Sequence, residues 1–261
     1  MAKTTDKKTV KAQAKAGEKT EAQEINPDIE AGTEQFYQAV EADRLQQSIL
    51  EVSENKGLRN GIFGVLGLVA VAVIGIFGWQ WYVEKQETKA QQELFAAQFY
   101  FEKDSLNAAL KGDGATTVGV EKIADEYSMT KAGDLAAFYE GTAYLKEGKF
   151  NEAIESLKAF NADDYLVQAR AYSLIGDAYM ELDNLDEAIT YYKKASNHSP
   201  NDFFTPEYLM KLGLAYELKN DYAMAAQAYE TIVENHKKSD AVNKAKRALG
   251  RAESMKGKKA A

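Results

Sequence analysis

The chain has 261 residues, a formal net charge of −8, 45% hydrophobic residues, three prolines and no cysteine. The lack of cysteine excludes disulfides, thiolate zinc sites and cysteine nucleophiles, and the acidic balance speaks against general nucleic-acid binding, which needs clustered lysine and arginine. So few prolines favour continuous helix in a chain long enough for one or two domains.

Two segments precede the long apolar run of this chain. Residues 1–32 consist mainly of Lys, Thr, Ala, Gln and Glu. They cannot bury enough apolar surface to offset the entropy lost on ordering, so we predict a disordered tail. Residues 33–58 predict an amphipathic helix, because large apolar side chains recur there at roughly helical spacing. These side chains are Phe36, Val40, Leu45, Ile49 and Val52. Such a helix lies on a membrane surface, packs on a partner, or stays solvated.

A run of 23 residues from Gly61 to Val83 contains no charged side chain. At about 1.5 Å per residue a helix of this length spans a hydrocarbon core of roughly 30 Å. Aromatic residues that favour the membrane interface stand near its end, at Trp79, Trp81 and Tyr82. A cleaved signal peptide would have a shorter apolar region nearer the N-terminus. We therefore predict one uncleaved transmembrane helix over residues 59–83.

Five glycines interrupt this apolar run, although a simple membrane anchor does not need glycine. On a helical wheel they fall within one arc of about 120°. They are Gly61, Gly64, Gly67, Gly75 and Gly78. Small residues let helix backbones approach closely in lipid, so this arc is a candidate transmembrane packing face. Chance clustering and the general tolerance of membrane helices for glycine remain the alternative.

The charges beside the predicted span give its orientation only weakly. Each flank carries three Lys/Arg within about 20 residues, so the positive-inside rule does not decide. Within five positions of the apolar run, two basic residues, Lys56 and Arg59, precede it and one, Lys85, follows it, and the first 20 residues add six lysines. We predict a cytoplasmic N-terminus and residues 84–261 on the other side; the reverse orientation remains open.

Self-comparison of residues 134–240 reveals three similar blocks. Glycine stands at Gly141, Gly176 and Gly213, which gives spacings of 35 and 37. A tyrosine follows three residues after each glycine, an alanine twelve after it and a large apolar residue sixteen after it. These residues are Tyr144, Tyr179 and Tyr216, then Ala153, Ala188 and Ala225, then Leu157, Tyr192 and Tyr229. The pattern predicts paired helices that cross closely at glycine and alanine and stack into a continuous core.

These blocks resemble the tetratricopeptide repeat (TPR) family, whose repeat of about 34 residues has the same order of Gly, Tyr, Ala and Phe/Tyr and a closing Pro. The second block also has Ala195 and Pro200, whereas the first block lacks both closing residues. The resemblance implies an α-solenoid of three TPR helix pairs. With the single transmembrane helix predicted before it, the sequence indicates an all-α fold. Residues 84–133 predict a degenerate helical pair without the repeat signature, and residues 241–261 a capping helix with a basic tail.

No pattern for catalysis or metal binding occurs in the sequence. The two histidines, His198 and His236, stand near the ends of repeats and lack partners at a recognised motif spacing. Asp113 lies between two glycines but lacks the further acidic groups of a calcium loop, so we interpret it as part of a turn. The sequence therefore predicts a protein that is not an enzyme and takes no cofactor, metal ion or small-molecule substrate.

The TPR resemblance implies a polypeptide-binding groove along the first helix of each repeat. Carried over at the offsets −3, +1 and +4 from the glycine, its residues are Phe138, Thr142, Leu145, Ser173, Asp177, Met180, Met210, Leu214 and Glu217. This apolar and acidic mixture suits an extended apolar or basic polypeptide, because methionine adapts to varied surfaces. Burial of these side chains by neighbouring repeats or by the capping helix is the alternative.

Charge is unevenly distributed over the predicted solenoid. Residues 84–236 carry 14 Lys/Arg and 27 Asp/Glu, a balance of −13. Residues 237–261 carry nine and two, a balance of +7. Either this basic end neutralises the acidic body, or it contacts anionic lipid headgroups or an acidic partner.

From residue 33 to 255, the order of segments resembles the YfgM-like family of ancillary subunits of the bacterial Sec translocon. The resemblance implies a single-pass inner-membrane protein whose periplasmic TPR domain binds exported polypeptides or a membrane-anchored periplasmic chaperone. Two alternatives remain: a structural scaffold of a cell-envelope assembly or secretion complex, and a cytoplasm-facing TPR receptor.

Overall fold

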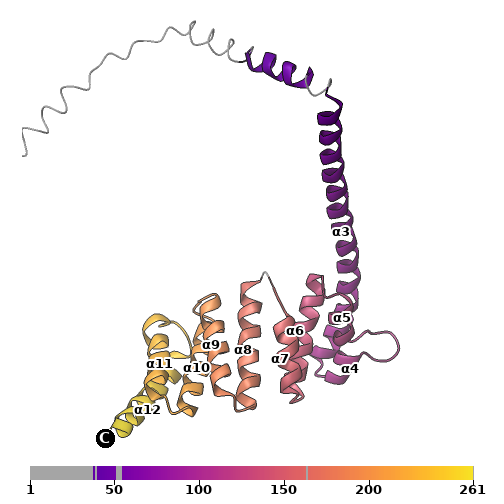
Figure 1. The fold of residues 1–261 in the computed structure, drawn as a ribbon. Coiled ribbons are helices and arrows are strands. Elements are labelled where there is room, and N and C mark those ends of the chain that lie inside the picture. Colours follow the sequence, from indigo (N-terminus) through magenta and orange to yellow (C-terminus); the bar gives the residue numbers. More distant parts are fainter. Residues whose placement is uncertain (1–37, 39, 51–54, 163, 261) are drawn as a thin grey trace, which may run out of the picture. The chain divides into compact units, whose positions relative to one another are not determined.

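The computed structural model describes residues 38, 40–50, 55–162 and 164–260 (Figure 1). The predicted tail over residues 1–32 lies outside the described residues. Residues 40–50 are helical, and Leu45 and Ile49 of the predicted amphipathic segment are exposed. The chain divides into two units, residues 1–75 and residues 76–261.

Helix α3 (Lys56–Glu102) contains the predicted span. It begins where the side chain of Asn55 accepts hydrogen bonds from the backbone N–H groups of Gly57 and Leu58, at 3.1 and 3.2 Å. Its apolar run has a mean hydropathy of 2.5 in an 18-residue window without a buried residue. By length and composition, it is one helix that is able to cross a membrane.

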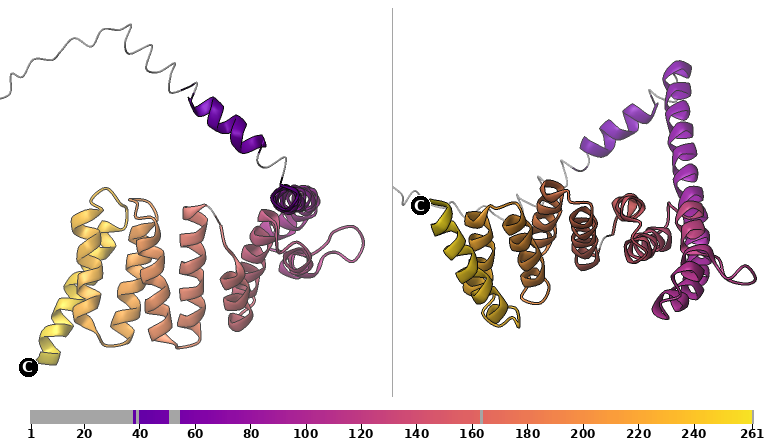
Figure 2. Two further views of the ribbon diagram at one scale, coloured as in Figure 1. Left: turned by 45° about the horizontal axis from the view of Figure 1, so that its top comes forward. Right: turned by 90° about the horizontal axis from the view of Figure 1, so that it is seen from below.

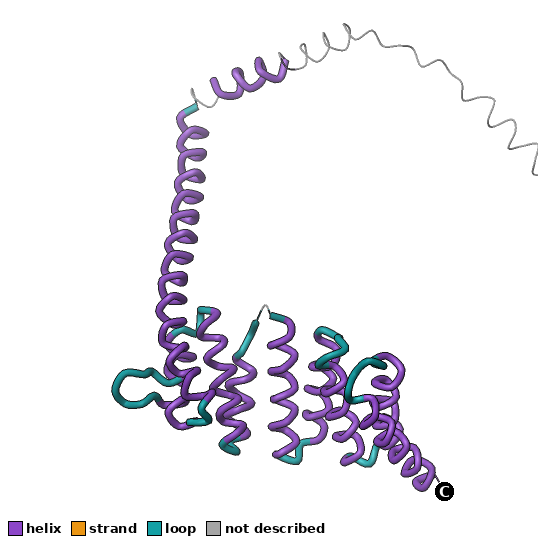
Figure 3. The backbone as a smooth tube through the Cα atoms, turned by 180° about the vertical axis from the view of Figure 1, so that it is seen from behind, coloured by secondary structure: helices purple, strands orange, loops and turns teal. Residues whose placement is uncertain are grey.

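The second unit is a row of short helices that stand side by side in chain order, with one isolated β-bridge between Gly112 and Val118 in the described part (Figure 2, Figure 3). After α3 come α4 (Leu106–Lys111), α5 (Val120–Glu126), α6 (Lys131–Lys146), α7 (Phe150–Ala159), α8 (Tyr165–Glu181), α9 (Leu185–His198), α10 (Thr205–Leu218), α11 (Tyr222–Asn235) and α12 (Val242–Ala260). The three predicted repeats are the pairs α6–α7, α8–α9 and α10–α11. We call α6, α8 and α10 the first helices and α7, α9 and α11 the second helices.

The repeated glycines lie where the two helices of a pair touch. A Cβ atom placed on Gly176 would stand 2.6 Å from Cε1 of Tyr192, and one placed on Gly141 would stand 2.6 Å from Cγ of Leu157. In the third pair Tyr229 covers Gly213 in the same way. The large residue sixteen positions after the glycine therefore lies directly on its Cα, which confirms the predicted close crossing.

The turns within the three pairs share one conformation. Gly148, Asp183 and Asn220 stand seven residues after the repeated glycine, and each has a positive φ, of 75°, 57° and 59°. In each turn, the next backbone N–H donates to the carbonyl of the repeated tyrosine, at 2.8 to 2.9 Å. These bonds satisfy carbonyls that the end of the first helix leaves unpaired.

The same turn joins α3 to α4. Asp104 has φ 57°, and the backbone N–H of Ser105 donates to the carbonyl of Tyr100 at 2.9 Å. Ala97 and Ala109, both fully buried, occupy the places of the repeated glycine and alanine. The helical pair over residues 84–133 thus carries a repeat turn that a search for glycine did not reveal.

A loop over residues 112–119 separates α4 from α5. The carboxylate of Asp113 accepts hydrogen bonds from the backbone N–H groups of Ala115, Thr116 and Thr117 at 2.8 to 2.9 Å. These backbone bonds, led by that from Thr117, hold the pKa of Asp113 well below its usual range. Asp113 therefore organises a turn, as the sequence indicated.

Helix α12 covers the last repeat. Its buried residues Ala245, Ala248 and Ala252 join a core cluster with residues of α10 and α11. Gly250 stands 37 residues after Gly213, yet no heavy atom would lie within 4 Å of a Cβ placed on it. Helix α12 thus packs as a further first helix whose pairing side is uncovered, as expected of a capping helix.

Candidate protein-binding surface

Two of the three residues predicted for the groove in the first repeat, Phe138 and Leu145, contact other parts of the solenoid. Phe138 is half-buried, with its ring centroid 5.2 Å from that of Phe160. Leu145 is also half-buried and packs against a cluster shared by α7 and α8. Between them, the hydroxyl of Thr142 donates to the carbonyl of Phe138 at 2.7 Å. These side chains fill the boundary between the first and second repeats.

Polar contacts link the predicted residues of the second repeat to α10. Lys211 Nζ lies 2.7 Å from Asp177 Oδ2 and 3.2 Å from the fully buried Ser173 hydroxyl. The Tyr192 hydroxyl donates to Asp177 Oδ1 at 2.7 Å. Burial, followed by the charge of Asp177, raises the pKa of Tyr192 far above its usual value. Met180 packs against the core cluster of the third repeat.

Two of the third repeat's predicted residues border α12. Glu217 accepts hydrogen bonds from the Arg251 guanidinium at 2.9 to 3.2 Å. Leu214 is 46% exposed and, with Glu217, Leu218 and Met255, lines a cavity of about 250 Å³. The remaining predicted residue, Met210, packs on the core cluster of its own repeat.

Several of the nine predicted positions therefore lie where successive first helices meet. Asp177 and Glu217 each form an ion pair with a basic residue of the next such helix. In the described solenoid Leu214 is the one predicted residue that is exposed, with the exposed Leu218 four residues later. Whether these positions contact a bound polypeptide stays a prediction.

The five glycines of the predicted packing face lie in the apolar run of α3. No heavy atom of the described chain would stand within 4 Å of a Cβ placed on any of them. They are Gly61, Gly64, Gly67, Gly75 and Gly78. Their role as a packing face stays a prediction.

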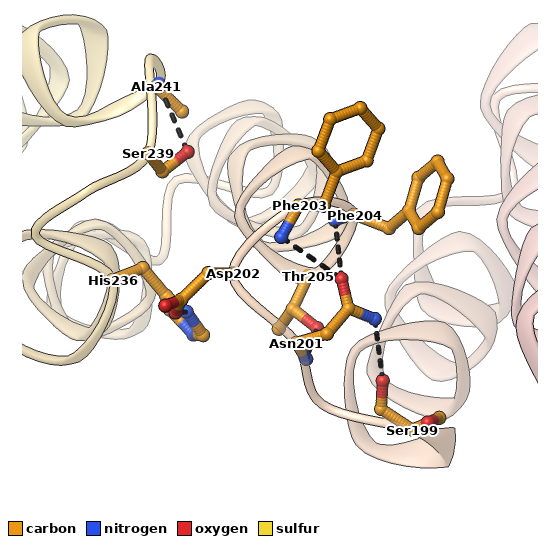
Figure 4. A network of polar contacts seen from close by, with 9 residues as sticks. All are labelled: Ser199, Asn201, Asp202, Phe203, Phe204, Thr205, His236, Ser239 and Ala241. Atoms are coloured by element: carbon orange, nitrogen blue, oxygen red, sulfur yellow. Dashed lines mark hydrogen bonds and ion pairs between the residues drawn. The ribbon is translucent and has the colours of Figure 1, made fainter.

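A more exposed feature, which sequence reasoning missed, is the loop between α9 and α10 (Figure 4). Phe203 is 80% exposed at its tip. Beneath it Asn201 accepts hydrogen bonds from the backbone N–H groups of Phe203 and Phe204, at 3.0 and 2.8 Å, and donates to the Ser199 carbonyl at 2.9 Å. The backbone N–H of Asn201 in turn donates to the Thr205 hydroxyl at 2.8 Å. These bonds hold an apolar ring out in solvent.

Contacts from the end of the third repeat support the same loop. His236 Nδ1 lies 2.8 Å from Asp202 Oδ1. Figure 4 labels both residues. A cavity of about 730 Å³ opens beside the loop, lined by apolar groups and by charges of both signs. Its residues include Phe203, Phe204, Met210, Lys238, Asp240 and Lys244. One feature of the sequence indicates this loop. The repeated glycines Gly176 and Gly213 are 37 residues apart instead of 35, which marks two extra residues in this repeat.

Both histidines are engaged in structural contacts. The ring of His198 meets that of Tyr172 edge-on at 5.5 Å, and His236 pairs with Asp202. Within the described residues, no three His, Asp or Glu side chains are grouped so that they could hold a metal ion.

Comparison with known proteins agrees with this geometry. Residues 59–164 match a model described as a tetratricopeptide repeat-like domain, and residues 167–238 match a tetratricopeptide repeat model. The second unit is therefore a TPR solenoid, the class of fold that serves as a protein–protein interaction module. A crystal structure of MamA protein has the same fold: its TM-score is 0.52 at 23% identity, and the match covers 64% of this chain and 82% of that one.

Among curated proteins, the chain is similar to the uncharacterized protein ycf37 of Guillardia theta. The two are 33% identical over 101 residues, which is 37% of this chain and 55% of that protein. The match thus spans about half the length of this relative.

Proposed function

We propose that this chain is a membrane-anchored protein-interaction module. The observation that carries the proposal is helix α3, which holds an exposed, uncharged apolar run and then supplies buried residues to the solenoid core. These buried residues are Ala90, Leu94 and Ala97. An apolar run of this length is stable in a bilayer, and a TPR solenoid presents surface for polypeptides. One helix thereby joins an anchor to a binding domain.

The surface best suited to a partner lies around α10. Phe203 and the cavity beside it stand at the N-terminal end of α10, and Leu214 with its smaller cavity lies further along the same helix. Aromatic side chains in firmly held positions are frequent anchors of protein interfaces. Because Asp177 and Glu217 are paired within the solenoid, apolar contact rather than acidic charge provides the main attraction.

The finer proposal is an ancillary, chaperone-like role at the Sec translocon of a bacterial inner membrane. The N-terminus lies in the cytoplasm and the solenoid in the periplasm, where it binds exported polypeptides or a periplasmic chaperone. The position of the transmembrane helix before the TPR domain in the chain supports this role. The glycine face of α3 supplies a surface for docking on another helix in the membrane.

Affinity purification of the full chain from detergent, followed by mass spectrometry, tests the partner. We expect translocon subunits to copurify, and a triple variant Gly64→Leu, Gly67→Leu and Gly75→Leu to lose them. A matched change to leucine of Val65, Val69 and Val73 should retain them, because these residues are already large. Absence of translocon subunits from the wild-type purification would refute this role.

Photocrosslinking from position 203 then distinguishes a client-binding protein from a scaffold. Many exported chains in the crosslinked products indicate a client-binding protein, whereas one dominant partner indicates a structural scaffold of an envelope complex. Protease protection of the C-terminus in sealed vesicles tests the orientation. A cytoplasmic C-terminus would instead indicate a cytoplasm-facing receptor.

A further inference from the structure

Residues 127–131, which are the turn between α5 and α6 and the first residue of α6, lie against the part of α3 that ends the apolar run. One cavity of about 370 Å³ is lined by Trp79, Tyr82 and Val83 of α3 together with residues 126–130. A second, of about 550 Å³, is lined by Trp79 and Val83 with Met129 and its two following residues. The turn therefore stands beside the aromatic end of the run. The two cavities share Trp79, Val83, Met129 and Thr130 as lining residues, and together we call them the crevice.

Specific hydrogen bonds hold this turn in place. The Glu87 carboxylate of α3 accepts from the backbone N–H of Ala132 at 3.1 Å, and Glu93 accepts from the Tyr127 hydroxyl at 3.3 Å. Within the turn, the Thr130 hydroxyl donates to the Tyr127 carbonyl at 2.8 Å and accepts from the N–H of Gly133 at 3.0 Å. The turn is thus fixed to α3 by residues that follow the apolar run by one to three helical turns.

Met129 projects from this fixed turn with 66% of its surface exposed. An exposed methionine is unremarkable on its own. Here, however, its neighbours in the crevice are the exposed rings of Trp79 and Tyr82, which favour the boundary between headgroups and acyl chains. Because Met129 and Trp79 line one cavity, both side chains lie at the same level along α3.

We propose that residues 127–131 form a second membrane contact, in which Met129 enters the headgroup–acyl boundary and phospholipid fills the crevice. The inference rests on the proposed membrane span. Glu84, Glu87 and Glu126 line the crevice beside Lys131, so its charges give no preference for anionic headgroups. The occupant is the interface of an ordinary zwitterionic bilayer, attracted by apolar area. This contact fixes the N-terminal end of the solenoid at the membrane surface.

Single-cysteine labelling tests the contact without background, because the chain has no cysteine. The full chain with Met129→Cys is labelled with an environment-sensitive fluorophore and reconstituted in phosphatidylcholine vesicles. Val73→Cys, within the apolar run, and Phe203→Cys, on the exposed loop, are matched controls. We expect lipids with a shallow nitroxide to quench the Met129 label several-fold more than the Phe203 label. Aqueous iodide should show the opposite order.

The depth reference is internal to the protein. Its two tryptophans, Trp79 and Trp81, both lie at the end of the apolar run. Quenching of the intrinsic tryptophan fluorescence of the unlabelled chain by brominated lipid therefore reports the depth of the interface. The Met129 label should report the same depth. If the Val73 label is quenched by lipid but the Met129 label behaves like the Phe203 label, the second contact is refuted and the span stands. If lipids with a nitroxide deep in the acyl chain fail to quench the Val73 label, the span is refuted, and the contact with it.

Discussion

At the scale of single residues, a glycine and a large side chain form one contact that recurs in every repeat. Tyr192 lies on Gly176 with its hydroxyl bonded to Asp177, and Tyr229 lies on Gly213. A ring that rests on a bare Cα brings two helices closer than any side chain would allow. The close approach excludes water and makes the site intolerant of even one added methyl group.

Replacing Gly176 by alanine should therefore destabilise the solenoid. The new methyl group would overlap the Tyr192 ring, at a cost of about 1–3 kcal/mol that exceeds the gain of up to about 1 kcal/mol in helix propensity. Gly250→Ala is the matched control, because it changes the corresponding position of α12, where the added methyl group meets nothing. We expect thermal melting of the full chain, followed by far-UV circular dichroism, to show a lower midpoint for Gly176→Ala and an equal or higher one for Gly250→Ala. Equal losses in both would contradict the proposed overlap.

The buried tyrosine hydroxyl also makes stability depend on alkaline pH. In the folded state the pKa of Tyr192 is raised, whereas in the unfolded chain it is about 10. The folded state thus retains the proton that the unfolded state releases, so stability is full below about pH 10 and falls as the pH rises further.

Tyr192→Phe keeps the ring on Gly176 and removes the ionisable group. We expect the variant to be less stable at neutral pH by about 1 kcal/mol, because it lacks the hydrogen bond to Asp177. From about pH 10 to about pH 11 the wild-type protein should lose up to roughly 1.4 kcal/mol more than the variant. Urea denaturation at both pH values measures the difference. If the free energy of unfolding fell equally with pH in the wild type and in the variant, the Tyr192 hydroxyl would not control the loss of stability at alkaline pH.

At the scale of helices, ion pairs join one first helix to the next. Lys211 of α10 pairs with Asp177 of α8, and Arg251 of α12 pairs with Glu217 of α10. The carboxylate of each pair stands at a position that the TPR resemblance assigned to a groove. The carboxylates are partly shielded from water. Loss of the basic partner therefore leaves a partly desolvated negative charge without its hydrogen-bond donor, which is destabilising.

Arg251→Ala should loosen the capping helix. Glu217 would keep its low exposure, with 14% of its side chain accessible, but lose its cation, and we expect a loss of about 1 kcal/mol. Lys246→Ala removes a charge from an exposed position of the same helix and should change stability by less than about 0.5 kcal/mol. Hydrogen exchange of the α12 amides compares the two variants, and we expect faster exchange in Arg251→Ala. Equal exchange in the two variants would argue against a stabilising pair.

At the scale of the whole molecule, the solenoid is a linear array in which each helix packs mainly on its neighbours in the chain (Figure 1). Damage to one repeat should therefore spread over short distances only. This property distinguishes the array from a globular domain with a single shared core.

In Gly176→Ala, we expect hydrogen exchange to rise in α8 and α9 and, more weakly, in α7 and α10. Helix α12 should retain its protection, because it packs on α11 and α10. A uniform rise over every helix would mean that the solenoid unfolds as one cooperative unit. Mass-spectrometric exchange on the full chain in detergent distinguishes the two results.

The sequence by itself determined the all-α class, the three repeats and one helix able to span a membrane. Each of these depends on local spacing. Gly176 and Tyr192 stand sixteen residues apart because two helices and a turn need that length, and the apolar run is defined by composition alone.

Only the tertiary structure decided how these elements meet. Asp177 appeared as a groove residue, but Lys211, 34 residues later, pairs with it at the boundary between first helices. Ala97 takes the place of the repeated glycine seven residues before Asp104, and only the backbone conformation at Asp104 reveals the repeat turn. The exposure of Phe203 depends on side chains folded beneath it, and that of Met129 beside Trp79 on a turn bonded to a helix more than forty residues away. Contacts between residues far apart in the chain leave no periodic trace in the sequence, because packing, not spacing, selects them.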